Sequence, residues 1–273
     1  MIGGGCRFLG AGRGPGEDGG EMTDSVAIEV GDDYVATVEL RRPPNNFFSL
    51  EMVAGIADAL ESLDDDPRCR AAVLCAQGKH FCAGADFSGE GVGYTTADLY
   101  AAAVRIFRTH NPVVAAVQGA AVGGGLGLAL AADFRIAAPE ARFSANFARL
   151  GFHQGFGLSV TLPRLVGPQV AADLLYTGRR VPGEEAANLG LADGLADLDD
   201  HRHAAHGIAR EIAMSAPLAV RSIRATLRGD LADQVEAAVA HEHREQDRLQ
   251  RTADFAEGSR AMLERRTPEF RGE

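Results

Sequence analysis

The sequence contains no tryptophan, and Lys79 is its single lysine, so arginine supplies nearly all of the positive charge. With 27 basic and 38 acidic residues, the formal net charge is -11 at pH 7. Binding to a nucleic-acid duplex needs an excess of basic side chains that neutralise phosphates, so the charge balance argues against a nucleic-acid partner. The chain also lacks an apolar run close to the roughly 20 residues that span a bilayer, which argues against a membrane protein.

Cysteine is scarce as well, with four in the chain and no C-x-x-C pair. So few cysteines in 273 residues do not make a disulfide framework, and we expect a reducing, cytoplasmic location. Residues 1–21 are rich in glycine and lack the apolar region of a secretory signal. We expect this N-terminal extension to be disordered.

From residue 22 onward, strand-like and helix-like patterns alternate. Segments 26–30 and 34–40 alternate around the turn Gly-Asp-Asp and predict a β-hairpin, while Ser49 is a suitable N-cap for an amphipathic helix. Further strands are expected at 70–77, 112–119 and 133–139, separated by helices. Such alternation predicts an α/β core.

The chain beyond Pro182 is expected to be helical throughout, including a long charged helix over residues 231–252. We therefore divide the protein into the extension 1–21, an α/β core over 22–210 and a helical C-terminal region over 211–273. Histidines in this part (His201, His203, His206, His241 and His243) lie on charged helix faces, and without an H-E-x-x-H pattern we predict no metal site.

The segment AVQGAAVGGGLGLALAAD, residues 116–133, has five glycines at the head of a predicted helix. Glycine costs about 1 kcal/mol relative to alanine inside a helix, so this pattern indicates close approach of something to the backbone. A dinucleotide fingerprint does not fit, because Leu128 and Leu130 stand where its last glycine belongs, and no P-loop lysine follows. Two explanations for the glycines remain. They form a helix N-terminus that stabilises developing negative charge, or they allow tight helix packing.

A second small-residue turn lies in GKHFCAGADF, residues 78–87, again directly after a predicted buried strand. Two such turns could each direct one backbone N–H at the same oxygen. Two donors on one oxygen form an oxyanion hole. No G-x-S-x-G motif accompanies them, so an α/β-hydrolase nucleophile is missing.

The ordered pair HFCAGADF and VQGAAVGGGLGLALAAD, about 40 residues apart, resembles the crotonase family, also called the enoyl-CoA hydratase/isomerase superfamily. The resemblance extends from roughly residue 26 to 270 and includes RRPPNNFFS, ARFSANFARLGF and LLYTGRRVPGEEAANLGLADGL. It implies a spiral of ββα units, a helical C-terminal trimerisation region, and a homotrimer or a hexamer built as a dimer of trimers. It also implies an acyl-CoA thioester as substrate, with no cofactor beyond the coenzyme A of that substrate.

Carried over from the resemblance, the two oxyanion donors are the backbone N–H groups of Ala85 and Gly124. Their neighbours Ala83, Asp86 and Gly123 are then expected to contact the substrate. The arginines Arg41 and Arg42 stand where family members approach the CoA phosphates, although an arginine-rich chain offers many chance matches.

The acids that the family uses for proton transfer are missing. The two hydratase glutamates correspond to Gly127 and Phe147, and the carboxylate position of other branches corresponds to Gly155. A positioned general acid or base contributes roughly 10² to 10⁴ in rate, so efficient hydration by the usual route is not expected.

His153, whose ordinary pKa suits proton transfer, is the candidate replacement, with a structural hydrogen-bonded histidine as the alternative. Asp86 is more typical of a helix cap, and Phe147 and Phe152 are expected to line an apolar acyl pocket. The sequence thus predicts an acyl-CoA enzyme that stabilises a thioester enolate. An isomerase, a thioesterase, a C–C bond-cleaving enzyme or an inactive acyl-CoA-binding homologue remain alternatives.

Overall fold

The computed structural model describes residues 25–85 and 95–273. The expected disorder of residues 1–21 and the expected contact of Asp86 with substrate both lie outside the described residues.

The main sheet has six strands in the order β1-β2-β3-β4-β6-β9. Its N-terminal hairpin pairs β1 (Val26–Val30) antiparallel with β2 (Val35–Leu40), as the alternating pattern predicts. The remaining pairs are parallel, with β3 (Ala71–Ala76) and β4 (Val113–Val117) buried along their whole length in the centre. Strands covered on both faces need such continuous apolar runs. The sheet ends with β6 (Phe134–Ala137) and β9 (Gly194–Leu195).

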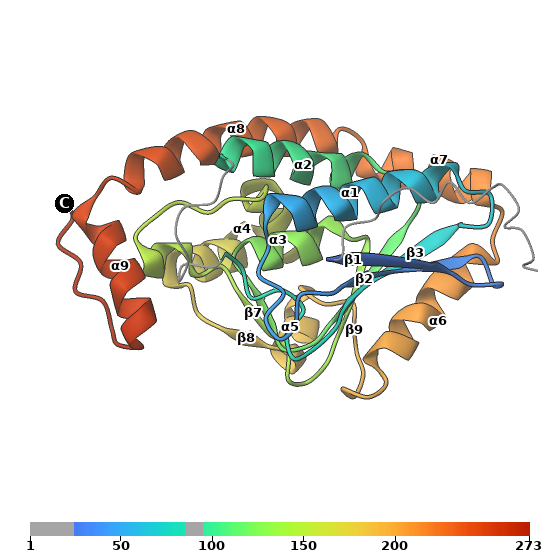
Figure 1. The fold of residues 1–273 in the computed structure, drawn as a ribbon, viewed down its shortest axis with the longest axis horizontal. Coiled ribbons are helices and arrows are strands. Elements are labelled where there is room, and N and C mark those ends of the chain that lie inside the picture. The colour runs from blue at the N-terminus through green and yellow to red at the C-terminus, as the bar shows by residue number, and fades with distance from the viewer. Residues whose placement is uncertain (1–24, 86–94) are drawn as a thin grey trace, which may run out of the picture.

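Helices cover both faces of this sheet (Figure 1). On one side, α1 (Leu50–Asp65) packs against α2 (Thr96–Arg108), which in turn packs against α8 (Leu231–Leu249). On the other side lies α6 (His201–Ala213), whose buried alanines contact valines of the central strands. The predicted α/β core is therefore confirmed as a sheet between two helical layers.

A second, three-stranded sheet has the order β5-β7-β8, formed by β5 (Ala120–Val122), β7 (Arg142–Ser144) and β8 (Val181–Pro182). The predicted strand at 112–119 does not lead directly into the glycines, because β5 lies between them. The chain turns at Gly119, which has a φ of 56°. It then forms β5, which pairs with β7 in the second sheet and ends at the glycine turn. The three residues of β5 are too few to show an alternating pattern of their own.

Further helices complete the fold in the described part of the chain. They are α3 (Gly124–Ala131), the 3-10 helix η1 (Asn146–Leu150), α4 (Leu158–Thr177), α5 (Gly183–Leu189), α7 (Pro217–Arg228) and α9 (Ala253–Glu264). The expectation of helix throughout beyond Pro182 was wrong at β9, and the long helix ends at Leu249. It stops there because Thr252 caps the next helix, its hydroxyl accepting from the Phe255 N–H.

The C-terminal helices fold back onto the core, since α8 packs along α2 and α9 against η1. The division at residue 210 stays a prediction. No helix in the described part of the chain is long and apolar enough to cross a membrane. The cytoplasmic location also stays a prediction.

Candidate active site

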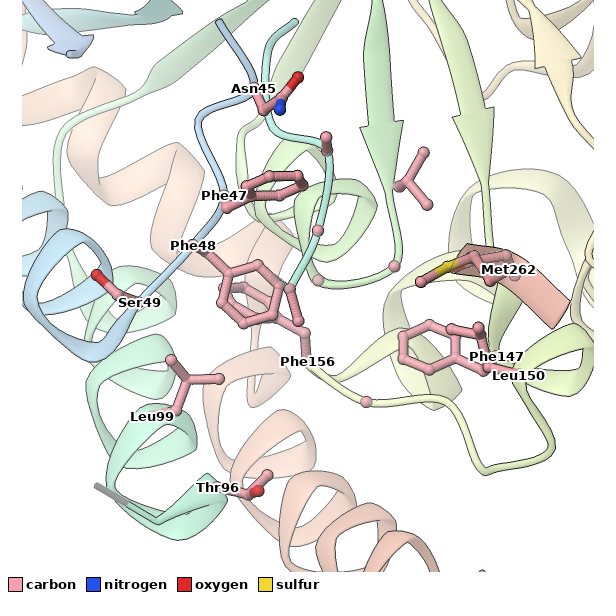
Figure 2. Close-up of a pocket in the computed structure, with 18 of the residues that line it drawn as sticks. Asn45, Phe47, Phe48, Ser49, Thr96, Leu99, Phe147, Leu150, Phe156 and Met262 are labelled. Carbon is pink, nitrogen blue, oxygen red and sulfur yellow. The ribbon is translucent and has the colours of Figure 1, made fainter. Parts of the chain in front are cut away.

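A cavity of about 990 Å³ is lined by several segments that are far apart in the sequence. Its walls come from the segment after β2, the turn after Cys82, the start of α3, η1, and helices α2, α8 and α9. The lining is mainly apolar (Figure 2), with Phe48, Phe156 and Leu99 on one side and Phe147, Leu150 and Met262 on the other. Such an apolar cavity with few polar groups is typical of a small-molecule site.

The first predicted oxyanion turn follows Cys82, which bridges to Ala121 of β5 through backbone hydrogen bonds on both sides. Gly84 has a φ of 90°, a conformation that other residues rarely adopt. Its carbonyl accepts from the Phe48 N–H, while the Ala83 N–H donates to the Asn45 carbonyl. These bonds fix the turn and leave Ala85 at its end.

The second turn leaves β5 at Gly123, which has a φ of 57° and donates its N–H to the Ser144 carbonyl. Gly124 is then the first residue of α3, a position whose N–H has no partner within the helix. Within the described residues, neither the Ala85 N–H nor the Gly124 N–H donates to another protein group. Because the Cys82 and β5 segments pair, both turns reach the same cavity.

The glycines of α3 also have a packing reason. A Cβ atom on Gly124 would lie 2.2 Å from the Phe48 ring, and one on Gly125 would lie 2.1 Å from the Cys82 carbonyl oxygen. A Cβ on Gly127 would lie 2.6 Å from Cβ of Phe156. Tight packing therefore accounts for three of these glycines, and it coexists with the free N–H of Gly124.

The structure shows what surrounds Gly127, Phe147 and Gly155, the positions at which the resemblance would place acids. Phe156 fills the space over Gly127, and its ring meets the Phe48 ring edge to face at 6.3 Å between centroids. The Tyr100 hydroxyl oxygen lies 1.8 Å from where a Cβ of Gly155 would stand. Phe147 packs against Phe152 at 5.4 Å between centroids. No carboxylate or imidazole is found among the described residues of the cavity wall.

Most of the predicted site residues come together in this cavity. Those that line it are Arg41, Arg42, Ala83, Ala85, Gly123, Gly124, Phe147 and Phe152. The guanidinium groups of the two arginines lie at the rim, where Arg41 pairs with Glu39 at 2.9 Å and Arg42 donates to the Ser49 hydroxyl at 2.7 Å. Both are exposed to incoming anions.

His153 is not brought into the cavity wall. Its Nδ1 lies 2.9 Å from the Gln154 carbonyl oxygen, and its ring stands edge to face with His241 of α8 at 5.7 Å between centroids. The role of His153 as proton carrier stays a prediction. Elsewhere, no group of three metal-binding side chains was found among residues 25–85 and 95–273.

This chain is similar to known proteins in both sequence and fold. Residues 31–273 match the profile of the enoyl-CoA hydratase/isomerase family. This chain belongs to the enoyl-CoA hydratase/isomerase family. It is 43% identical over 181 residues to a protein of Mycobacterium tuberculosis named as a probable enoyl-CoA hydratase, covering 64% of this chain and 70% of that one. It is 33% identical to a carnitinyl-CoA dehydratase of Salmonella arizonae, covering 87% of this chain and 95% of the relative.

The solved structure of an enoyl-CoA hydratase/isomerase from Pseudoalteromonas atlantica superposes with a TM-score of 0.82 at 30% identity, covering 90% of this chain and all of that one. The protein therefore has the crotonase fold that its motifs predict, and it is an enzyme of the enoyl-CoA hydratase/isomerase family.

In this member of the enoyl-CoA hydratase/isomerase family, sequence analysis missed two polar groups of the cavity, Tyr100 and Gln246. Tyr100 donates its hydroxyl to Gln246 Oε1 at 2.8 Å, and both side chains are buried. Burial is the main cause that raises the pKa of Tyr100 far above its ordinary value. On helix patterns alone, both residues are indistinguishable from ordinary core positions, so no sequence signal was available.

Proposed function

We propose that the cavity binds an acyl-CoA thioester and that the N–H groups of Ala85 and Gly124 both donate to its carbonyl oxygen. The observation that carries the proposal is the pairing of Cys82 with β5, which brings the N–H groups of Ala85 and Gly124 to one apolar cavity; neither donates to a group that the structure describes. Negative charge that develops on the thioester oxygen is then stabilised as an enolate.

Two features strengthen this stabilisation. The cavity wall is largely apolar, so a hydrogen bond to a charged oxygen is less screened there than in water. Gly124 also begins α3, whose helix dipole directs partial positive charge at the same point. Removing one donor from such a site typically costs about 10² to 10³ in rate.

The reaction that follows the enolate differs from ordinary hydration. Gly127, Phe147 and Gly155 leave no carboxylate at the expected acid positions, and Phe156 and Tyr100 fill the space over the two glycines. Among the described residues outside the cavity wall, His153 is the candidate proton carrier through a change of its position, and the substrate itself is the alternative. An isomerase or a thioesterase would need a proton carrier of this kind.

A second candidate is a C–C bond-cleaving reaction. It is favoured by the lack of carboxylate and imidazole groups in the described cavity wall. In such a cleavage, the bonding electron pair stays with the α-carbon as the enolate, which then takes a proton from solvent, so the reaction needs an oxyanion hole but no protein base to remove an α-proton.

We further propose that Arg41 and Arg42 contact the CoA phosphates and that the protein is a homotrimer or a dimer of trimers. The exposed position of both guanidinium groups at the cavity rim supports the first part. Exposed apolar residues on α7, which include Leu218 and Leu227, support the second.

The test is deuterium uptake from heavy water at the α- and γ-carbons of saturated and unsaturated acyl-CoAs, read by mass spectrometry for the wild type and His153→Ala. Enzyme-dependent exchange supports enolate formation, and its loss in the variant assigns the proton transfer to His153. Exchange that persists in the variant removes His153 from the mechanism. Release of a carbon fragment without exchange supports C–C cleavage, and binding without any change of mass contradicts the enolate.

A further inference from the structure

The two proposed oxyanion turns follow segments that run side by side, and their alignment depends on how these segments pair. Cys82 pairs with Ala121 in a parallel bridge. Ala85 and Gly124 each lie three residues beyond this pair. Because parallel segments run in the same direction, equal steps bring both N–H groups to the same end of the pairing. A shift of one segment along the other would therefore separate the two proposed donors.

One hydrogen bond of this pairing is made by a side chain. The Val122 N–H donates to the Cys82 carbonyl. A regular parallel ladder would continue two residues earlier, with the Ala120 N–H donating to the His80 carbonyl. That carbonyl accepts instead from the Asn46 Nδ2 group at 2.7 Å. The Ala120 N–H donates to Nδ1 of the His80 ring at 3.0 Å, so the imidazole takes the place of a backbone acceptor.

The half-buried His80 is held in place by its surroundings, and it is not part of the cavity wall that the structure describes. Its own N–H donates to the Pro44 carbonyl at 3.2 Å. Its ring lies against Gly119, where a Cβ atom would stand 2.5 Å from Nδ1. The glycine before β5 therefore leaves room for the imidazole. From this position, His80 can act on the proposed site only through the backbone that it holds.

The bond to Ala120 requires an imidazole without a proton on Nδ1. A backbone N–H can only donate, so the proton of the neutral ring lies on Nε2, and protonation would place two donors opposite each other. Burial and then the positive charges of Lys79 and of Arg142 on β7 lower the pKa of His80 below its ordinary value. The residues described above as bonded to His80 or packed against it carry no titratable side chain. The bond is therefore present at neutral pH and is lost in acid.

We propose that His80 is a positioning residue of this enzyme. By accepting from the Ala120 N–H, it holds β5 in register with segment 78–85, so that the N–H groups of Ala85 and Gly124 converge on one oxygen. Loss of this bond, by substitution or by protonation of the ring, lowers the fraction of molecules in which both donors are aligned. The inference rests on the proposed function, which assigns these two donors to the thioester oxygen.

Two substitutions separate the acceptor from the rest of the side chain. His80→Asn places Oδ1 where Nδ1 stands and does not titrate, whereas His80→Ala removes the acceptor. The rate measured is enzyme-dependent α-proton exchange of straight-chain saturated acyl-CoAs in heavy water. His80→Ala is expected to exchange about fivefold slower than the wild type at neutral pH, the loss of one net hydrogen bond, and His80→Asn to recover most of this loss. The KM for the thioester is expected to change little, because His80 does not line the cavity.

The pH profile gives a readout that a merely structural role would not move. The exchange rate of the wild type is divided by that of His80→Asn at each pH, so that the effect of the proton carrier, which both share, cancels. This ratio is expected to be constant above about pH 7 and to fall about fivefold in acid, as the imidazole takes up a proton. His203→Asn, at an exposed site on α6, is the control and should keep the wild-type profile. Thermal unfolding at each pH checks that every variant is folded.

The outcomes separate the two proposals. If no thioester of the series exchanges at any pH, the proposed function is wrong and the role of His80 falls with it. If exchange depends on the enzyme but the wild type and His80→Asn have parallel pH profiles, the proposed function stands and the positioning role is overturned. An exchange rate of His80→Asn as low as that of His80→Ala also overturns it. If His80→Ala does not fold, the ratio of the wild type to His80→Asn decides.

Discussion

At the scale of single residues, the cavity is shaped by pairs in which a glycine leaves space that a larger side chain fills. Gly155 leaves room for the Tyr100 hydroxyl, and Gly127 leaves room for Phe156. In both pairs, the larger residue occupies the space that an acid would need. An acidic side chain introduced at either glycine would therefore clash with Tyr100 or Phe156.

This complementarity predicts the effect of Gly155→Ala. The added methyl would meet the Tyr100 oxygen at 1.8 Å, so we expect a loss of about 1 to 3 kcal/mol in the free energy of unfolding. In a Tyr100→Leu background, the same change is expected to cost less. Urea unfolding of the two single variants and the double variant measures the coupling.

The matched control is Gly207→Ala on α6, where a Cβ would meet nothing within 4 Å. This change is expected to stabilise the helix by about 0.5 to 1 kcal/mol. Strictly additive effects of Gly155→Ala and Tyr100→Leu would show that the two positions do not share the space.

The raised pKa of Tyr100 predicts a specific alkaline weakening. The unfolded phenol ionises near pH 10, while the folded one keeps its proton, so the native state binds more protons above that pH. The stabilisation is complete below about pH 10 and is lost above it, by up to about 1.4 kcal/mol per pH unit. Urea midpoints between pH 8 and 11 should fall more steeply for the wild type than for Tyr100→Phe. Parallel profiles would contradict this assignment.

At the scale of elements, α4 depends on a distant carboxylate. Glu242 of α8 is fully buried, and its two oxygens accept from the N–H groups of Gly157 and Ser159 at the start of α4, at 2.9 and 3.0 Å. Acidic groups are favourable at a helix N-terminus, where N–H groups otherwise lack partners. One side chain thus joins two elements that border the cavity.

We expect Glu242→Gln to lower the free energy of unfolding by about 2 kcal/mol, because one N–H loses its partner and the other loses a charged acceptor. Glu236→Gln on the same helix is the control. Its carboxylate is exposed and pairs with Arg108, so the change should cost less than about 0.5 kcal/mol. Chemical denaturation compares the two, and equal small losses would refute the capping role.

Elements set by local chemistry could be predicted from the sequence, while those set by distant pairing could not. The hairpin of β1 and β2 follows from alternation, and α1 follows from Ser49, whose hydroxyl accepts from the Met52 N–H. The strands β5 and β9 are too short for a pattern and exist because β7 and β6 pair with them. Tyr100 reached the cavity unpredicted for the same reason, since Gly155 and Gln246 are remote in sequence.

At the scale of the whole molecule, α7 carries large apolar side chains that nothing in the described chain covers. Leu218, Ile223 and Leu227 are exposed by 80%, 59% and 71%, and three such residues on one helix are unusual for a free surface. The proposed oligomer would bury them.

The pair Ile223→Glu and Leu227→Glu is therefore expected to convert the oligomer to monomers in sedimentation velocity. Leu198→Glu changes an exposed leucine in the segment before α6 and serves as the control, which should leave the mass unchanged. An oligomer that survives both α7 substitutions would place its interface elsewhere.

The proposed function depends most directly on the Gly124 N–H, which is proposed to stabilise the enolate oxygen. Gly124 is the first residue of α3, a helix position that accepts proline, so Gly124→Pro removes the N–H without breaking a hydrogen bond within the helix, although its Cβ must displace the Phe48 ring. Gly124→Ala is the control, because it adds the same Cβ beside Phe48 and keeps the N–H.

The decisive measurement is the rate of α-proton exchange in heavy water for an acyl-CoA that both variants bind. If the Gly124 N–H stabilises the enolate oxygen, exchange is expected to be about 10² to 10³ slower in Gly124→Pro than in Gly124→Ala, with similar affinity for the thioester. Equal exchange rates in the two variants would show that this N–H does not bear the developing charge.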